Sequence, residues 1–328
     1  MRRLNRESVS FQRRETVKRI LFITLLVHLI LVPVHAQQST SEWGPEDERG
    51  AANRLTPAKV LEATKLIKTG KIYQLGKVYE HGIPLFGSRH YSLTIVGNPS
   101  GGPLGENKLV WYDEMFSGEI GQIGTQFDGL GHIGTRVGNE DVYYNGFKSS
   151  NFSKPYGLEK LGVEKAGSFF TRGVLIDVAG YKGVERLEVG YVITVADTEE
   201  ALKKQNVSVG EGDVVIFRTG HGTLWMKDNE TFNKGQPGIG MAVGQWLVNK
   251  KIVMVAGDTW GLEVVPGEDA TQAFPVHQLL IAQHGIYILE NLDLEELAKD
   301  QVYEFAFVFS PLRLKGGTGS PGNPIAVK

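Results

Sequence analysis

Short apolar runs, separated by polar and glycine-rich segments, follow one another along the chain beyond residue 56. Some runs are rich in β-branched residues and too short for a helix, so they predict buried strands. Others place apolar residues three or four positions apart, which predicts helices with one buried side. The predicted strands are 71–78, 91–96, 174–178, 214–218, 252–256, 286–289 and 303–309, and the predicted helices are 57–69, 198–205, 243–248, 276–283 and 294–298.

The order of these elements indicates the fold class. Strands alternate with helices, as in an α/β protein, yet the strands outnumber the helices and the alternation is irregular. We therefore predict a mixed sheet or a partly closed barrel flanked by a few helices. Residues 97–108 and 316–324 are predicted to be loops, because glycine and proline accumulate there. Since no repeat or linker divides the chain, residues 37–328 are predicted to form a single domain.

The first 36 residues have a different pattern. Residues 1–19 contain seven basic and two acidic side chains, and an almost unbroken apolar run follows at 20–34. The run is shorter than the roughly 20 residues that span a bilayer, and it ends at Val34-His35-Ala36, with small residues where signal peptidase reads. We therefore predict a cleaved export signal at 1–36 and a periplasmic or secreted protein. The Sec and twin-arginine routes both stay open.

Composition and charge exclude several kinds of chemistry. The chain has no cysteine, which excludes disulfides, a thiolate nucleophile and cysteine-ligated zinc. Its formal net charge is −2, and removing residues 1–36 makes it more acidic. Without a basic run, nucleic acid and anionic membrane surfaces are excluded as expected partners. A small-molecule substrate is the partner that we expect.

The densest polar cluster lies in the glycine-rich stretch 121–132. Its side chains Gln122, Gln126, Asp128 and His132 all have even numbers, so a regular strand would place them on one face. A straight strand would hold the two glutamines about 13 Å apart, too far to share one ion, but the intervening glycines permit a bend. A turn whose polar side chains cap the local backbone explains the same spacing. The spacing by itself leaves both interpretations open.

The stretch resembles the signature H-x-G-T-H-x-D-x-P-x-H of the cyclase-like metal-dependent hydrolases, the family that includes bacterial kynurenine formamidase and isatin hydrolase. Gly124-Thr125, Asp128 and His132 fall on its positions. The resemblance implies a barrel-like swivelling β/α fold, a divalent metal such as manganese or zinc, and a homo-oligomer. Other segments similar to the family follow in the same order at 43–45, 50–53, 218–220, 257–260, 277–280, 290–292, 311–313 and 319–321.

The signature departs from the family at three positions. The first two histidines, which ligate the metal in the family, are Gln122 and Gln126 here, and the proline is Leu130. An amide oxygen is a weaker donor for zinc than imidazole. Gln122, Gln126 and Asp128 could still form an oxygen-rich site that suits manganese, magnesium or calcium. Alternatively the metal lies between Asp128 and the residues described next.

The second arrangement places the metal on Asp128, His277 and Glu290, where the family can hold another ion. We favour it because two neutral amides would leave a divalent cation with only one nearby charge. Asp128 takes part in both arrangements. His132 is the predicted general base or acid, since an unperturbed pKa near 6.5 suits proton transfer at neutral pH. The residues predicted to bind substrate are Trp43, Phe127 and Trp260.

Three further polar residues lie outside the predicted strands and helices. Asp258 and Glu263 flank Trp260, and each could line a pocket or serve as a capping or surface residue. His221 follows Arg218-Thr219-Gly220, where the resemblance places a loop on the substrate side.

Three functions are compatible with the sequence. The leading hypothesis is a hydrolase that opens a cyclic or aryl amide, such as an N-formyl anilide, or a lactone. The second is a non-catalytic protein that binds a planar ligand on the same fold, with a degraded metal site. The third is a lyase or isomerase acting on a carbohydrate-like acid, which needs only the same metal and base.

Overall fold

A curled mixed sheet of nine strands forms the centre of the protein in the computed structural model, which describes residues 41–328. The predicted export signal at 1–36 lies outside the described residues. From one edge to the other, the strands are β1 (Ile72–Gln74), β17 (Ile325–Val327), β15 (Glu304–Phe309), β9 (Phe169–Asp177), β11 (Val214–Arg218), β13 (Met254–Gly257), β14 (Tyr287–Glu290), β6 (Gln126–Asp128) and β16 (Gly319–Pro321).

The middle of this sheet is parallel and its two sides are antiparallel. Strands β9, β11, β13 and β14 run in one direction, whereas β15 and β6 pair with them antiparallel. Parallel strands are covered on both faces and therefore need continuous apolar runs. All five residues of β11 are buried. The predicted α/β class with a mixed, partly closed sheet is confirmed.

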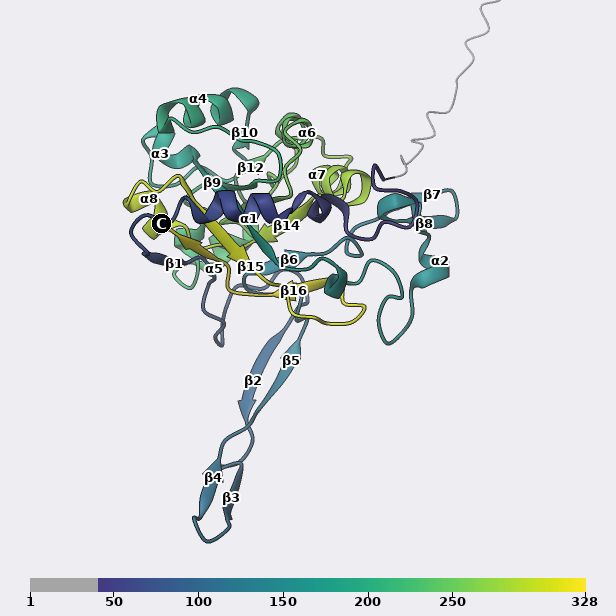
Figure 1. Ribbon diagram of the computed structural model, residues 1–328, viewed down its shortest axis with the longest axis vertical. Coiled ribbons are helices and arrows are strands. Elements are labelled where there is room, and N and C mark those ends of the chain that lie inside the picture. Colours follow the sequence, from purple (N-terminus) through teal and green to yellow (C-terminus); the bar gives the residue numbers. More distant parts are fainter. Residues whose placement is uncertain (1–40) are drawn as a thin grey trace, which may run out of the picture. The chain divides into compact units, whose positions relative to one another are not determined.

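Helices α3, α4 and α6 lie over one face of the sheet (Figure 1). Helix α4 begins at a capping box, in which Thr194 and Asp197 satisfy each other's backbone amides. Among residues 41–328, no helix is both long and apolar enough to cross a membrane. The α-helices are α1 (Pro57–Thr64), α2 (Ser149–Phe152), α3 (Val178–Lys182), α4 (Val195–Gln205), α5 (Asn229–Lys234), α6 (Met241–Asn249), α7 (Pro275–His277) and α8 (Glu295–Lys299).

Both segments predicted as loops contain a strand. Strand β16 lies within 316–324 and pairs with β6, and β3 (Gly101–Leu104) lies within 97–108. Glycine is needed for the first pairing, because a Cβ on Gly319 in β16 would lie 2.8 Å from the carbonyl oxygen of Phe127 in β6. The glycine content therefore marks a close approach of two backbones as well as a turn.

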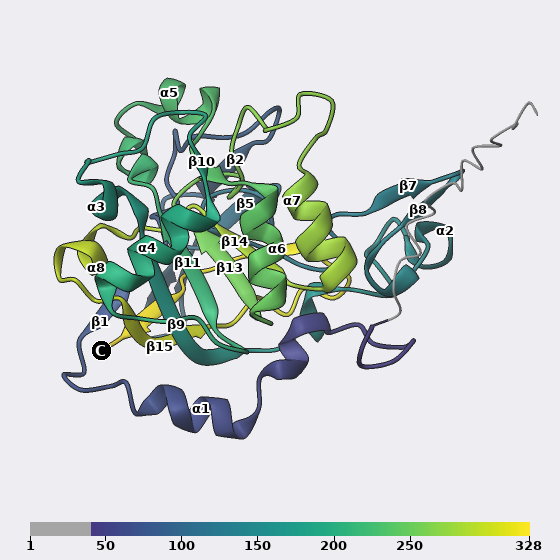
Figure 2. The same ribbon diagram turned by 90° about the horizontal axis from the view of Figure 1, so that it is seen from above.

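Residues 91–118 form a hairpin that leaves the sheet, and we call it the arm (Figure 1). Strand β2 (Tyr91–Ile95) pairs with β5 (Glu114–Gly118), and further out β3 pairs with β4 (Leu109–Trp111). The predicted strand at 91–96 is therefore present, but it belongs to the arm. Figure 2 shows a further short pair, β7 (Thr135–Val137) with β8 (Glu140–Val142). The other short pair is β10 (Val192–Ile193) with β12 (Gly238–Ile239), both labelled in Figure 1.

Candidate functional site

The pairing of β6 with β14 brings polar side chains from two strands onto one face. Gln126 lies opposite Glu290 in this antiparallel pair, and Phe127 lies opposite Leu289. Because side chains alternate along a strand, Gln126, Asp128 and Glu290 share one face while Phe127 points to the other. The predicted shared face is thus present for the two residues of the motif that lie in the strand.

A tight turn before β6 brings the side chain of Gln122 close to Asp128. Gly124 has φ +61°, and a Cβ there would lie 2.4 Å from a ring atom of Tyr79, so the turn needs glycine. The side chain of Asn291, the residue after Glu290, donates a hydrogen bond to the Gly124 carbonyl at 2.7 Å. The amide nitrogen of Gln122 then donates to Asp128 Oδ1 at 2.7 Å. The bend that the glycines permit therefore closes the motif onto Asp128.

Three buried residues from separate elements face one another at this point. Asp128 comes from β6, His277 from α7 and Glu290 from the end of β14. His277 Nε2 lies 3.2 Å from Glu290 Oε1 and 3.8 Å from Asp128 Oδ2. One potential ligand atom from each residue lies within 4.8 Å of the others. The structure thus brings together the predicted trio, with two carboxylates and one imidazole directed at one point.

Glu263 holds the imidazole of His277 in this orientation. Its carboxylate lies 2.6 Å from His277 Nδ1 and also accepts the backbone amides of Val276 and His277, at 3.2 and 3.0 Å. A carboxylate on the far nitrogen of a histidine is the usual partner in protein metal sites, where it fixes the ring and raises its basicity. Of the interpretations considered for Glu263, the capping role applies: from a buried position it accepts the first backbone amides of α7, and it also orients His277.

The buried carboxylates of the cluster require a positive charge beside them. Burial and the negative charge of Asp128 raise the pKa of Glu290 to about 7. Burial opposes a charged His277, but hydrogen bonds to Glu263 and Glu290 raise its pKa to about 10. The protein without metal therefore balances its buried carboxylates with an imidazolium. A divalent cation supplies that positive charge equally well, so the donor set of two oxygens and one nitrogen fits manganese or zinc.

The two glutamines turn their amide nitrogens toward the carboxylates. Gln122 donates to Asp128, as described, and Gln126 donates to Glu290 Oε2. Arg89 donates to Gln122 Oε1 at 3.1 Å, which fixes this amide. In this arrangement the glutamines orient the carboxylates. It agrees with the arrangement favoured from the sequence.

A pocket of about 210 Å³ opens onto the cluster. Its aromatic wall consists of Phe86 stacked on Trp260, with ring centroids 4.2 Å apart, and of Phe274 against the edge of Trp260. Trp260, which is predicted to bind substrate, thus lies on the lining of the pocket beside the cluster. A planar ligand fits between an aromatic wall and a polar floor of this kind. The lining residues are Phe86, Arg89, Gln122, Gln126, Asp128, His132, Ile133, Trp260, Gly261, Phe274, His277 and Glu290.

His132 lies on the pocket wall beside the cluster. A turn after β6, closed by the His132 amide on the Gly129 carbonyl at 3.0 Å, places its Nε2 4.0 Å from Asp128 Oδ1. Burial lowers the pKa of His132, although the charge of Asp128 opposes the shift. A neutral imidazole at this position is able to accept a proton at neutral pH.

Two predicted substrate-binding aromatics lie elsewhere. Phe127 is fully buried in the core, where its ring stacks on Tyr287 with centroids 5.0 Å apart. Trp43 lies under the guanidinium of Arg54, 4.6 Å from the ring centroid, and lines a different pocket with His284. The predictions for Phe127 and Trp43 are wrong. Strand alternation directs Phe127 away from the site. A cation–π contact with Arg54 holds Trp43 at the different pocket.

We expect Phe127→Ala to lower the free energy of unfolding by about 3–5 kcal/mol, because the cavity it leaves in the core cannot close fully. Urea unfolding of the wild type, Phe127→Leu and Phe127→Ala measures the effect, and the leucine variant should lose less. If the leucine variant had normal stability but a weakened affinity for substrate, Phe127 would be a substrate-binding residue after all.

Other polar residues near the strand ends have structural roles. Asp258 is buried and accepts hydrogen bonds from the Thr219 amide, the Thr219 hydroxyl and the Gly220 amide at 2.7–2.9 Å. It therefore fastens the turn after β11. His221 is fully buried, stacks on Phe232 and donates to its carbonyl at 3.2 Å, so it lies outside the pocket lining.

The sequence analysis missed five lining residues, which are Phe86, Arg89, Ile133, Gly261 and Phe274. They lie in irregular segments without periodic pattern or motif. Only the folded chain shows that these segments meet Trp260 and Gln122.

Comparisons with known proteins agree with this geometry. Residues 73–264 match the family described as "Putative cyclase". A crystal structure of a novel cyclase is similar, with 36% sequence identity and a TM-score of 0.78, over 87% of this chain and 96% of that chain. Isatin hydrolase A from Ralstonia solanacearum shares the fold at 20% identity and a TM-score of 0.58, over 83% of this chain and 97% of its own.

A third similar structure is an isatin hydrolase bound to the product analogue thioisatinate. It has 20% identity and a TM-score of 0.56, over 82% of this chain and 94% of that one. No curated protein matches the chain closely enough to count as a relative.

Proposed function

Because the chain belongs to the cyclase family, we propose that it is a metal-dependent hydrolase that opens a cyclic or aryl amide or a lactone. The observation that carries this proposal is the buried trio Asp128, His277 and Glu290 at the floor of an aromatic-walled pocket. Isatin, named in two similar structures, is a planar cyclic amide, and a flat ring of that kind suits the wall formed by Phe86 and Trp260.

Asp128, His277 and Glu290 would hold the metal in this proposal. A divalent cation at such a site polarises a substrate carbonyl and lowers the pKa of water. Glu263 keeps the Nε2 side of His277 directed at the site, and the amide groups of Gln122 and Gln126 fix one oxygen of each carboxylate. Manganese and zinc are the proposed metals, because both accept mixed oxygen and nitrogen donors.

His132 is the proposed general base. Its neutral imidazole would take a proton from the attacking water and return it to the leaving nitrogen or oxygen. The aromatic wall would hold the ring of the substrate and would exclude water from one side of the pocket. The chain's own residues thereby supply proton transfer and orientation, two separate contributions to the rate.

The sequence supports two further parts of this proposal. The predicted signal at 1–36 supports a location in the periplasm or outside the cell, and the acidic charge balance favours a small-molecule substrate over nucleic acid. We propose no membrane partner for the processed chain.

Metal analysis combined with an activity assay tests the proposed function. The purified protein should contain one equivalent of manganese or zinc and hydrolyse formylkynurenine or isatin. Asp128→Ala should lose both properties. Ligand binding that survives a chelator, without hydrolysis, would favour the non-catalytic binding protein, and a product formed without uptake of water would indicate a lyase or isomerase.

We expect His132→Asn to reduce kcat by about 100-fold while metal binding is retained, because general acid–base catalysis contributes at least this much. Asparagine keeps the polarity but does not take up a proton. Steady-state kinetics and elemental analysis of the variant separate the two properties. A variant that loses its metal together with its activity would make His132 a ligand and overturn its assignment as the base.

A further inference from the structure

The pocket over the trio contains one arginine, Arg89. Of the described residues that line this pocket, Arg89 is the only lysine or arginine, whereas Asp128 and Glu290 form an acidic floor. Its side chain is half-buried and belongs to the irregular segment just before β2. The fixed positive charge of an arginine beside a substrate pocket favours an anionic group on the ligand.

Arg89 lacks the partners that the other sheltered arginines have. Among residues 41–328, three other arginines are buried or half-buried, and each pairs with two carboxylates; these are Arg54, Arg172 and Arg218. Arg89 has no carboxylate partner in this part of the chain, and its guanidinium donates one hydrogen bond there, to Gln122 Oε1 at 3.1 Å. A guanidinium carries five N–H donors in a fork that matches a carboxylate. The remaining donors of Arg89 are therefore available to a ligand.

Arg89 lies beside both the aromatic wall and the trio. Its guanidinium carbon is 5.5 Å from the centroid of the Phe86 ring, which stacks on Trp260. The side chain of Gln122 accepts from Arg89 and donates to Asp128 Oδ1, so one amide group separates the guanidinium from the trio. A substrate ring on the wall is therefore within reach of both groups, with its scissile bond at the trio and a charged substituent at Arg89.

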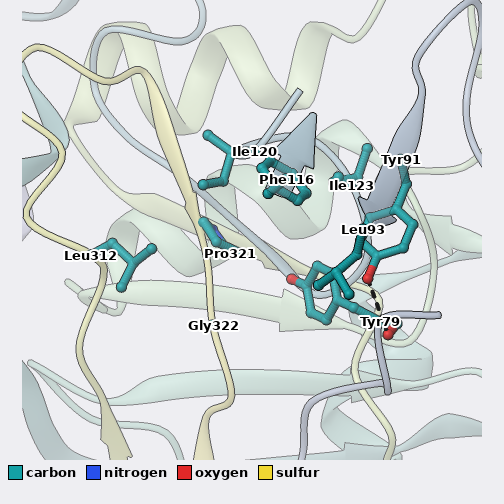
Figure 3. Close-up of a pocket in the computed structure, with 9 residues that line it drawn as sticks. All are labelled: Tyr79, Tyr91, Leu93, Phe116, Ile120, Ile123, Leu312, Pro321 and Gly322. Carbon is teal, nitrogen blue, oxygen red and sulfur yellow. Dashed lines mark hydrogen bonds between the residues drawn. The ribbon is translucent and has the colours of Figure 1, made fainter. Parts of the chain in front are cut away.

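A second pocket, of about 320 Å³, lies at the root of the arm and offers an anion no partner (Figure 3). Its lining consists of uncharged residues, namely tyrosine, phenylalanine, leucine, isoleucine, proline and glycine. Its two tyrosine hydroxyls already donate to backbone carbonyls, Tyr91 to Tyr79 at 3.3 Å, as drawn in Figure 3, and Tyr79 to Thr125. Of these two pockets, the one over the trio is therefore the one that suits a charged ligand.

Resting on the proposed function, we infer that Arg89 binds a carboxylate on the ring of the substrate and thereby selects an aromatic acid that carries the scissile amide. Two parallel hydrogen bonds from the guanidinium would hold the ring in one orientation. The pocket, at about 210 Å³, is smaller than the usual site for a drug-sized ligand. The carboxylate therefore belongs directly on a small ring, as in a benzoate. A single negative charge is favoured over a doubly charged phosphate, because Asp128 and Glu290 lie on the same floor.

A comparison of matched substrates tests this inference. The probes are the three isomers of formamidobenzoate and the corresponding formamidobenzamides, which have nearly the same shape and no charge. For the wild type, kcat/KM for the best benzoate should exceed that for its benzamide by about 10–100-fold, the value of hydrogen bonds to a charged group. Arg89→Gln should remove this preference and leave hydrolysis of the benzamide nearly unchanged. Arg89→Lys should keep part of the preference, since lysine retains the charge without the fork.

The neutral substrates also show whether Arg89 acts on the ligand or only on the protein. If Arg89 served only to fix the amide of Gln122, Arg89→Gln would slow both kinds of substrate by the same factor, and the inference would be wrong. Arg186→Gln, which changes an exposed arginine outside the pocket lining, is the control and should keep the full preference. Elemental analysis and circular dichroism check the metal content and folding of each variant.

Calorimetric binding of the products separates this inference from the proposed function, because it requires no reaction. The wild type should bind the best aminobenzoate about 10–100-fold more tightly than the matching aminobenzamide, and Arg89→Gln should bind both equally. That result in a protein that hydrolyses neither the formamides nor isatin would support the carboxylate site at Arg89 and contradict the proposed function. Equal affinities in the wild type, or a preference that persists in Arg89→Gln, would overturn the inference.

Discussion

Glu290→Gln should lower the affinity for manganese or zinc by at least about 100-fold and reduce hydrolysis to the background rate, since even partners outside the ligand set are worth 10–100-fold. The substitution keeps the shape of the side chain and removes one of the two carboxylates in the trio. Glutamine also replaces a charged oxygen donor by a neutral and weaker one. Equilibrium dialysis with elemental analysis measures the affinity, and kinetics on the same samples measure the activity.

Two further variants show whether the loss comes from the ligand itself. Glu263→Gln acts through the imidazole of His277 and should cost only about 10–100-fold in metal affinity. Glu296→Gln, on the surface of α8, should change neither property. Thermal unfolding of the metal-free proteins checks that each variant folds. If Glu290→Gln bound metal as tightly as the wild type, the metal would lie away from the trio.

The buried strands were predictable because each one is an unbroken run of mainly apolar residues along the chain. Strand β11 occupies Val214–Arg218 as predicted, and β14 is displaced by one residue to Tyr287–Glu290. Of the strands that the pattern did not predict, β4 is exposed, and β16 consists of a glycine, a serine and a proline. These strands form because their backbones pair with a partner strand that is distant in sequence or exposed. The apolar periodicity of the chain contains no signal for such pairing.

The candidate site was predictable to the extent that it follows strand alternation and the family motif. The even numbering of Gln126 and Asp128 gives their shared face, and the same rule puts Phe127 on the opposite face. The prediction that Phe127 binds substrate conflicted with the alternation already in the sequence. The contact between Glu263 and His277 was not predictable in this way. It joins a loop to the first turn of α7, and these two segments meet only in the folded chain.

The two glutamines are the departure that most affects the chemistry of the site. In the structure, each amide nitrogen serves a carboxylate of the trio, Gln122 on Asp128 and Gln126 on Glu290. A histidine at either position offers a nitrogen lone pair in place of that donor. Two imidazoles beside Asp128 make a three-residue donor set of the kind that holds zinc. The positions of the glutamines therefore describe a second ligand set adjoining the first, with Asp128 common to both.

The double variant Gln122→His/Gln126→His should consequently bind two equivalents of zinc where the wild type binds one. The new site should take zinc more tightly than manganese, because nitrogen donors favour zinc over manganese. Calorimetric titration with each metal, with elemental analysis of the dialysed protein, counts the equivalents. Gln245→His, on the exposed face of α6, is the matched control and should bind one. Adding Glu290→Ala to the double variant should remove the original site and leave the new one. One equivalent in both the wild type and the double variant, with a large gain in affinity, would show that the glutamines themselves are ligands.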